Sequence, residues 1–271
     1  MANSGRFGTD TEGSRRSFAV ITGASRGIGE QYAYALADLN HDVLLVARDK
    51  VNLERVAIEI TRLKPVDVML EVLDLAEPDA AVRLFAAARR YRDRIDLLVH
   101  NAGIGYYGSF ADMPMAEVQR MLRLHINTVA ESTRLFLPDM VARGSGTIIT
   151  VASVSGLSAN AWAAEYSATK AFLIAFFEAL AMEVRSQGVY VQVCCPGPTD
   201  TDHHGPADNP VRRRGQSPKQ VVQKSLAALA DRRILVATDW KSSLQLIIFR
   251  TIPQRLWQVV QALYHVLKRA F

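Results

Sequence analysis

Short runs rich in aliphatic and β-branched residues alternate with longer helical stretches along most of this chain, and this alternation constrains the fold more than any other feature. The predicted strands span residues 18–22, 42–47, 66–72, 95–100, 146–152, 189–195 and 234–237. The predicted helices span 28–39, 53–63, 80–91, 116–141, 161–187 and 218–229. A strand–helix–strand order at this rhythm predicts an α/β fold, in which right-handed crossovers cover both faces of a doubly wound parallel sheet.

The length of the chain allows one such domain, because 271 residues, 49% of them hydrophobic, can bury a large single core. Residues 1–17 are rich in Ser, Gly and Arg, and we predict a flexible lead-in there. The main domain is then expected over 18–239 and a separate tail over 240–271.

The cellular setting is indicated by cysteine usage and by apolar runs. The two cysteines are adjacent, at Cys194 and Cys195, so they cannot form an ordinary disulfide framework. The first residues lack the apolar run of a secretory signal, and no segment approaches the roughly 18 consecutive apolar residues of a membrane-spanning helix. We therefore expect a reducing, cytoplasmic location.

The net charge of +5 belongs to the tail. Five cations and no acidic residue follow Asp239, whereas the residues up to that point carry 27 basic and 27 acidic side chains. The main domain shows no basic run with interleaved aromatic residues, so the sequence predicts no nucleic-acid partner.

A glycine-rich turn, Thr22 to Gly29, follows the first predicted strand and opens the first predicted helix. Backbone N–H groups and the positive end of a helix attract a pyrophosphate at such a turn. A tight strand-to-helix connection with no ligand would need similar glycines. The strand before the turn and the helix after it favour dinucleotide binding.

Tyr166 and Lys170 are four residues apart on a predicted helix and therefore share one face of it. An ammonium beside a phenol favours the ionised form of the phenol, which would make Tyr166 a usable proton donor near neutral pH. Taken singly, such a Tyr is usually a core residue and such a Lys is usually solvated. A hydroxyl precedes them at Ser153, where the spacing to Tyr166 favours this residue over Ser155.

These motifs together resemble the short-chain dehydrogenases/reductases, over about residues 18 to 200. The resemblance rests on the order Thr22-Gly23-xxx-Gly27-x-Gly29, Asp74-Leu75, Asn101-Ala102-Gly103, Asn127, Ser153, Tyr166-xxx-Lys170 and Pro196-Gly197. It implies a single Rossmann-like domain of about seven parallel strands, with a nicotinamide dinucleotide lying across the carboxyl ends of the strands.

The resemblance also implies a catalytic set of four residues. Tyr166 would donate a proton to the carbonyl oxygen during reduction, and Ser153 would hydrogen-bond to the same oxygen. Lys170 would lower the pKa of the tyrosine and hold the nicotinamide ribose. Asn127, inside a long helix, would hold a water that links Lys170 to solvent. Two hydroxyl donors aimed at one oxygen stabilise the negative charge that hydride attack builds there.

The choice of cofactor is argued from charge. A dinucleotide with a free 2′-hydroxyl favours a carboxylate near the end of the second strand, and one with a 2′-phosphate favours a cation there. This chain has Arg48 at that point and Arg26 in the glycine turn, with no carboxylate at the strand end. Two guanidinium groups can converge on a phosphate, so NADPH is preferred over NADH. The alternative is that Arg48 caps a surface turn and either cofactor binds.

Further cofactor contacts follow from the resemblance, with Asp74 and Leu75 at the adenine and three groups of residues elsewhere. The glycine turn would contribute Gly23, Ser25, Arg26, Gly27, Ile28 and Gly29; the ribose would meet Asn101, Ala102 and Gly103; the carboxamide loop would contribute Pro196, Gly197, Thr199 and Thr201. Tyr166 and Lys170 would also touch the cofactor. His100 stands where many relatives have a second Asn.

The segment 202–217 is rich in Pro, Gly and charge, and we predict a mobile lid there. His203 and His204 have no further ligand at metal-binding spacing, so no metal is expected. The run 212–214 consists of three arginines, which either form a solvated loop or contact the phosphate of a CoA or an acyl-carrier protein.

In the tail, apolar residues recur at helical spacing from Leu244 to Phe271, and Pro253 is predicted to divide two helices. A basic amphipathic helix of this kind either lies peripherally on an anionic membrane or packs on the body or a subunit interface. By resemblance, a homo-oligomer is expected, formed through the helices at 116–141 and 161–187.

The sequence thus predicts an NADPH-dependent carbonyl reductase, or the reverse alcohol dehydrogenase. The substrate is expected to be a hydrophobic ketone, such as a 3-oxoacyl chain or a lipid-like ketone, because apolar residues flank the motifs: Ile104, Tyr106, Tyr107, Leu157 and Trp162. The alternative from another class is a non-catalytic NADPH-binding sensor or scaffold protein. The intact set of Tyr, Lys and Ser argues against it, because a sensor needs no tuned phenol.

Overall fold

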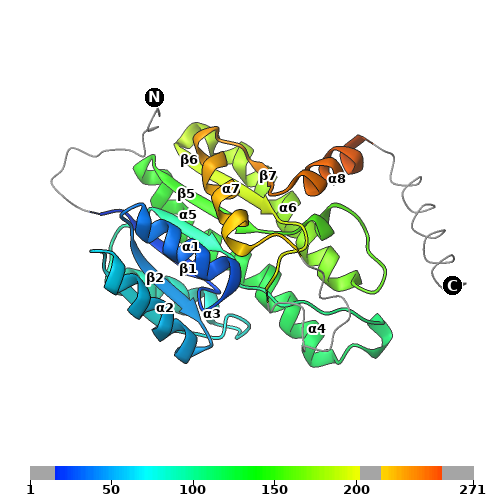
Figure 1. The fold of residues 1–271 in the computed structure, drawn as a ribbon, viewed down its shortest axis with the longest axis horizontal. Helices are drawn as coiled ribbons and strands as arrows, with labels where there is room; N and C mark the ends of the chain where they lie inside the picture. The colour runs from blue at the N-terminus through cyan, green and yellow to red at the C-terminus, as the bar shows by residue number, and fades with distance from the viewer. Residues whose placement is uncertain (1–15, 202–214, 252–271) are drawn as a thin grey trace, which may run out of the picture.

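One seven-stranded parallel sheet forms the centre of the molecule (Figure 1), with strand order β3-β2-β1-β4-β5-β6-β7. The computed structural model describes residues 16–201 and 215–251. The strands are β1 (Phe18–Thr22), β2 (Asp42–Ala47), β3 (Val68–Val72), β4 (Leu97–His100), β5 (Gly146–Val151), β6 (Val189–Cys195) and β7 (Leu235–Ala237). The predicted α/β, Rossmann-like fold with a parallel seven-stranded sheet is confirmed.

The helices follow the strands in the predicted alternation. They are α1 (Gly27–Asp38), α2 (Lys50–Leu63), α3 (Ala80–Tyr91), α4 (Met115–Leu122), α5 (Thr128–Arg143), α6 (Ala164–Val184), α7 (Pro218–Ala230) and α8 (Trp240–Thr251). Short 3₁₀ turns lie at η1 (Phe110–Asp112), η3 (Val154–Leu157) and η4 (Arg185–Gln187).

Each face of the sheet has its own hydrophobic core, because successive side chains of a strand point to opposite faces. Phe18 and Val20 of β1 belong to the core formed with α3, α5 and α6. Ala19 and Ile21 belong to the core formed with α1, α2 and α7 (Figure 1). Full burial of a large aliphatic or aromatic side chain contributes roughly 1.5–3 kcal/mol, so both helical layers are held firmly on β1.

The position of the site follows from the sheet order. β1 pairs with β2 on one side and with β4 on the other, so the chain moves outward to β3 and then returns across β1. Crossovers therefore leave β1 and β4 in opposite directions, and a crevice opens at their carboxyl ends. Thr22 ends β1 at this crevice and His100 ends β4 there.

The single long helix predicted over 116–141 is wrong. The structure has α4, then a π-helical segment η2 (Arg123–Asn127), then α5. Apolar spacing did not reveal the break, since helical periodicity continues on both sides of it. The helix predicted over 161–187 is also shorter, as α6 covers 164–184 and a 3₁₀ turn follows.

The first part of the tail, α8, is a helix whose start is capped by Asp239. The Asp239 carboxylate accepts hydrogen bonds from the Ser242 N–H at 2.9 Å and from the Ser242 hydroxyl at 2.6 Å. The predictions for Pro253 and the rest of the tail, for the lead-in up to residue 15, and for 202–214 lie outside the described residues. Of the helices described, none is long and apolar enough to cross a membrane.

Candidate active site

A cavity of about 820 Å³ opens at the carboxyl ends of the strands, and most of the predicted site residues line it. These are Gly23, Ser25, Arg26, Gly27, Ile28, Arg48, Asp74, Leu75, Asn101, Ala102, Gly103, Ser153, Tyr166, Lys170, Pro196, Gly197, Thr199 and Thr201. They come from segments spread over about 180 positions of the chain, so the fold brings together what the motifs only place in order. Gly29 and Asn127 are the predicted residues that do not line the cavity.

Gly29 lies just behind the cavity wall. A Cβ atom at this position would approach the Gly23 carbonyl oxygen to 2.1 Å, which no side chain tolerates. Gly29 thus allows α1 to start directly against the turn that leaves β1. The N-terminal N–H groups of α1 are thereby brought to the cavity, where they suit an anionic group.

The glycine turn is tied to the end of β4 through Asn101. The Asn101 side-chain amide donates hydrogen bonds to the carbonyl oxygens of Thr22 at 2.9 Å and Gly23 at 3.2 Å. The Asn101 N–H donates to the Thr22 hydroxyl, which itself donates to the Val99 carbonyl. These bonds give Asn101 a structural role at the crevice, beside its predicted contact with the ribose.

Tyr166 and Lys170 face the cavity from α6, and Ser153 faces it from the end of β5. All three side chains are buried. The Lys170 ammonium donates a hydrogen bond to the Val151 carbonyl oxygen at 3.0 Å and lies 5.7 Å from the centre of the Tyr166 ring. The Ser153 hydroxyl accepts a hydrogen bond from the Ser155 N–H at 3.1 Å, and Ser153 also hydrogen-bonds to Tyr166. Ser155 lines the cavity as well.

The ionisation of Tyr166 differs from the sequence expectation. Burial raises the pKa of the Tyr166 phenol, the nearby Tyr107 adds to this increase, and the hydrogen bond with Ser153 opposes it. Burial also lowers the pKa of Lys170 to about 8. The expected lowering of the Tyr166 pKa by Lys170 is therefore not found, because desolvation of the phenol dominates. Tyr166 is protonated at neutral pH and has a proton to donate.

Asn127 is the predicted catalytic residue that the structure does not bring to the site. It ends the π-helical segment with an exposed side chain. His125, two residues earlier, is buried instead, with its ring 6.1 Å from the Tyr166 ring. Its Nε2 accepts a hydrogen bond from the Ile104 N–H at 2.9 Å. The sequence does show a histidine two residues before the motif asparagine. It does not predict the π-helical segment that buries His125 and leaves Asn127 exposed.

Three arginines and two carboxylates form ion pairs at the end of the cavity near β2 and β3. Arg48 and Arg120 approach the same oxygen of Asp74, at 3.5 Å and 3.1 Å. Arg26 lies 3.7 Å from Asp49. Sequence reasoning missed Arg120, which reaches the cavity from α4, together with Glu117 of the same helix and Asp49.

The prediction that no carboxylate stands at the end of β2 is wrong. Asp49 follows Arg48 directly and lines the cavity. Its carboxylate caps α2 by accepting hydrogen bonds from the Asn52 N–H at 3.1 Å and the Asn52 amide at 2.7 Å. These bonds, with Arg26 and Arg55 nearby, lower the pKa of Asp49. The negative charge of Asp49 is thus already engaged by α2 and Arg26.

His100 is directed into the core and does not line the cavity. Its Nε2 lies 3.0 Å from the Thr133 hydroxyl of α5, and its ring lies 5.9 Å from the ring of Phe177. Burial lowers the pKa of His100 to about 3, so the ring is neutral at physiological pH.

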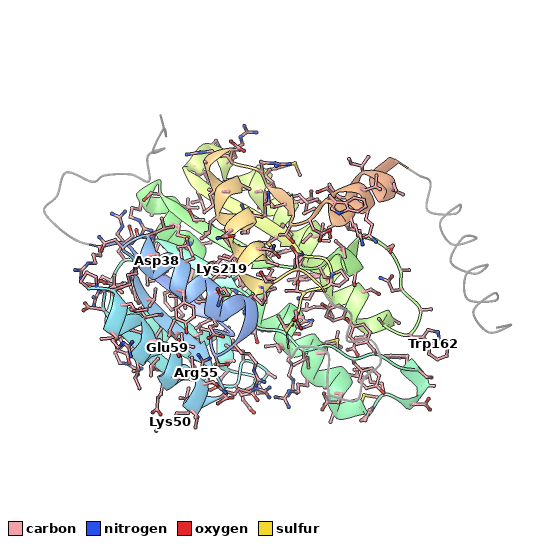
Figure 2. All side chains as sticks on the ribbon, viewed as in Figure 1. Asp38, Lys50, Arg55, Glu59, Trp162 and Lys219 are labelled. Atoms are coloured by element: carbon pink, nitrogen blue, oxygen red, sulfur yellow. The ribbon has the colours of Figure 1, made fainter. Side chains whose placement is uncertain are left out.

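The predicted apolar entrance is found in part. Ile104 and Tyr107 line the cavity, and Tyr106 packs with them in a small cluster around Tyr166. Leu157 packs against the main core. Trp162 is half exposed and points away from the body of the molecule at the right-hand edge of Figure 2.

The residues present fit a nicotinamide dinucleotide. The cavity joins the N-terminus of α1 to the Tyr166 and Lys170 side chains, as a long dianionic ligand requires. Arg120 lines the cavity, and its Nε atom is buried with no hydrogen-bond partner among the described residues. In the described ranges, no three His, Cys, Asp or Glu side chains are placed to hold a metal ion. His203 and His204 lie outside these ranges.

Comparison with known proteins gives the family. The sequence profile of the short chain dehydrogenase family matches residues 17–211. The protein is a member of the short-chain dehydrogenase family. This family consists of oxidoreductases that act on CH–OH groups and bind NAD(P).

Two relatives of this short-chain dehydrogenase are reductases by name. The ketoacyl reductase HetN of Nostoc sp. is 36% identical over 180 residues, which cover 66% of this chain and 62% of HetN. The very-long-chain 3-oxoacyl-CoA reductase of Anas platyrhynchos is 36% identical over 184 residues, which cover 66% of this chain and 59% of the relative. The matched region is thus less than two thirds of either relative.

A solved short-chain dehydrogenase from Sphingobium yanoikuyae, in complex with NADPH, has the same fold. It superimposes with a TM-score of 0.78 at 27% sequence identity, over 94% of this chain and 96% of that one. The similarity therefore extends over nearly the whole of both chains.

Proposed function

We propose that this short-chain dehydrogenase is an NADPH-dependent reductase that converts a hydrophobic ketone to a secondary alcohol, or catalyses the reverse reaction. The observation that carries the proposal is the buried, protonated phenol of Tyr166, hydrogen-bonded to Ser153 and beside the Lys170 ammonium, on the wall of a cavity that suits a dinucleotide. A site of this composition supplies two hydroxyl donors to one developing oxyanion.

The residues would act as follows. The bound nicotinamide dinucleotide supplies the hydride. Tyr166 donates its proton to the substrate oxygen, and Ser153 hydrogen-bonds to the same oxygen and polarises the carbonyl. Lys170, anchored on the Val151 carbonyl, supplies positive charge beside the phenol as the tyrosinate forms. The apolar wall formed by Ile104 and Tyr107 excludes water around the reacting atoms.

The preference for NADPH is supported by Arg26, Arg48 and Arg120 at one end of the cavity. Their partners Asp49 and Asp74 hold them in place through ion pairs of 3.1–3.7 Å. Guanidinium groups held in this way can form bidentate contacts with a 2′-phosphate. Asp74 and Leu75 would contact the adenine, and Thr199 and Thr201 would contact the carboxamide.

A hydrophobic substrate is supported by the cluster of Met113, Met121, Ala163 and Tyr166, against which Ile104 and Tyr107 pack. The names of two relatives, a ketoacyl reductase and a very-long-chain 3-oxoacyl-CoA reductase, support a 3-oxoacyl thioester as the substrate. Such a thioester would be presented on CoA or on an acyl-carrier protein.

The experiment is a substrate panel of 3-oxoacyl thioesters, long-chain ketones, steroids and quinones, followed through the loss of NADPH absorbance. Wild type is compared with Tyr166→Phe and with Tyr106→Phe, a tyrosine of the same cluster that does not line the cavity. We expect turnover that Tyr166→Phe loses and Tyr106→Phe keeps. Turnover by Tyr166→Phe at the wild-type rate would overturn the mechanism. NADPH binding without any turnover would favour the sensor or scaffold instead.

We expect a cytoplasmic protein, and peripheral contact with a membrane is supported by the outer face of α8. Trp240 and Leu244 are four residues apart, with 72% and 49% of their surfaces exposed, while Ser242 is buried on the opposite face. Lys241 lies 5.6 Å over the Trp240 ring, and no acidic residue follows Asp239. Sedimentation with anionic vesicles should be reduced in the double variant Trp240→Ser/Leu244→Ser; equal sedimentation would contradict the contact. Analytical ultracentrifugation of the wild-type protein tests the predicted homo-oligomer through the helices at 116–141 and 161–187.

A further inference from the structure

His125 connects two parts of the active site that are far apart in the sequence. Its side chain is 1% exposed and lies on the π-helical segment between α4 and α5. Nε2 accepts the hydrogen bond from the Ile104 N–H at 2.9 Å, and Nδ1 lies 2.9 Å from the Thr169 hydroxyl. Ile104 lines the cavity and Thr169 belongs to α6. One imidazole therefore joins the cavity wall to the helix that carries Tyr166 and Lys170.

The protons along this connection can be assigned from its ends. A main-chain N–H can only donate, so Nε2 of His125 is the acceptor and the ring proton is on Nδ1. The Thr169 hydroxyl donates its single proton to the Tyr166 carbonyl oxygen at 2.9 Å, so it accepts from Nδ1. The sequence of donors runs from Ile104 through His125 and Thr169 to the main chain of Tyr166. Every member is satisfied only when His125 is neutral in the Nδ1–H form.

His125 also contacts the side chain of Tyr166. The two ring centres are 6.1 Å apart with an interplanar angle of 68°, which is an edge-to-face arrangement. The His125 ring thus limits rotation of the phenol, while its hydrogen bonds hold the turn of α6 from which the phenol projects. Both restraints act on the orientation of Tyr166.

We infer that His125 is a positioning residue, which holds Tyr166 and the Ile104 segment in the geometry that proton donation to the substrate requires. The inference rests on the proposed ketone reduction. A displacement of a reacting group by about 1 Å can lower the rate by about 10²-fold. Loss of His125 should therefore lower kcat much more than it changes cofactor binding.

Three variants separate the contacts of His125. His125→Phe keeps a ring beside Tyr166 but removes both hydrogen bonds. His125→Asn places an amide where Nδ1 lies and can keep the bond to Thr169, and His125→Gln reaches toward the Nε2 position and can keep the bond to the Ile104 N–H. Arg123→Ala is the matched control, because its exposed side chain lies on the same π-helical segment.

We expect His125→Phe to lower kcat by roughly 10- to 100-fold, with the Kd for NADPH, measured by fluorescence titration, within about twofold of wild type. His125→Asn or His125→Gln should recover part of kcat, and Arg123→Ala should retain the wild-type kcat. A kcat within about threefold of wild type in His125→Phe would overturn the inference, as would a loss that neither amide restores. If His125→Phe does not fold, the two amide variants decide: wild-type kcat in both would overturn the inference.

A second measurement does not depend on turnover. Nitrogen NMR of the ¹⁵N-histidine-labelled protein, with His125→Gln used to assign the signal, reports which ring nitrogen carries the proton. We expect the neutral Nδ1–H form. The Nε2–H form would overturn the inference even if the enzyme is active, whereas the Nδ1–H form in a protein without turnover would leave the arrangement of His125 intact and contradict only the proposed function.

Discussion

The Nζ atom of Lys170 lies 3.0 Å from the carbonyl oxygen of Val151, in a side chain of which 3% is exposed. Burial of this positive charge costs free energy, because little water remains around the ammonium and the hydrogen bond in the structure is to one neutral carbonyl. Burial accordingly lowers the pKa of Lys170 to about 8. The protein thus keeps a destabilising ammonium where the proposed chemistry needs positive charge beside Tyr166.

Replacement of this lysine by a neutral side chain, Lys170→Met, should stabilise the protein at pH 7 and abolish turnover. The pKa is about 8 in the folded protein and 10.5 in the unfolded chain, so the unfolded chain binds more protons between these values. The free energy of unfolding of wild type therefore rises with pH across this window, and the cost of the charge is complete below it. A pKa shift of this size corresponds to about 3 kcal/mol of stability that Lys170→Met should gain. Loss of the hydrogen bond to Val151 subtracts about 1 kcal/mol from this gain.

Thermal unfolding at pH 7 measures the effect, with an expected increase in Tm of roughly 4–8 °C. Lys219→Met, at an exposed position of α7 labelled in Figure 2, removes a lysine without this burial and should leave Tm nearly unchanged. Equal Tm values for wild type and Lys170→Met would show that the ammonium is better solvated than its burial indicates.

His100 should make the protein sensitive to acid. Its pKa is about 3 in the folded protein and 6.5 in the unfolded chain. The unfolded chain therefore binds the proton more readily between these values, and stability is lost as the pH falls below 6.5. At pH 5 this one residue should remove about 2 kcal/mol from the free energy of unfolding. Urea unfolding at pH 7 and pH 5 should show a smaller pH-dependent loss in His100→Asn than in wild type; parallel losses would contradict the assignment.

Arg48→Ala should weaken NADPH selectively. The Arg48 guanidinium lies 3.5 Å from Asp74 on the cavity wall, and loss of a charged hydrogen bond to a phosphate costs about 1.5–3 kcal/mol. The KM for NADPH should therefore rise by roughly 10- to 100-fold, with the KM for NADH within about twofold. Lys50→Ala, which removes an exposed cation two residues away, should change neither value. An equal increase for both dinucleotides would mean that Arg48 does not act on the 2′-phosphate.

The parts of the site that sequence could predict are those fixed by local chemistry. The turn from Gly23 to Gly29 and the face shared by Tyr166 and Lys170 depend on spacing within one segment, and the structure has both on the expected elements. The exposed position of Asn127 has a different origin, because a π-helical segment changes which residue faces α6 without changing the apolar pattern. His125 became visible only with the contacts to Ile104 and Thr169, from two other segments.

Two electrostatic expectations, on the Tyr166 pKa and on the charge beside Arg48, differ from the structure because both depend on how the segments pack. The Tyr166 pKa depends on how much water the fold removes from the phenol, which residue spacing does not report. Asp49 could be read from the sequence as the neighbour of Arg48. Its pairing with Arg26 and its role as the cap of α2 depend on how β2 leads into the helix.

Gly156→Ala should separate the two hydroxyl donors of the proposed mechanism. Gly156 lies in η3, and a Cβ atom there would meet the main chain of α6 at 2.5 Å from the Lys170 carbonyl carbon. The contacting atoms of Lys170 and Ala171 are all main-chain atoms. The added methyl must therefore push η3, which begins after Ser153, away from the helix that carries Tyr166. Overpacking of this kind costs about 1–3 kcal/mol, and the misplaced Ser153 should lower kcat by roughly 10- to 100-fold.

Gly144→Ala is the control for stability alone, because its φ of +70° disfavours alanine and it lies outside the cavity lining. Chemical denaturation and steady-state kinetics on both variants test this: a Gly156→Ala protein that loses stability but keeps wild-type kcat would show that Ser153 and Tyr166 need not be held by this contact.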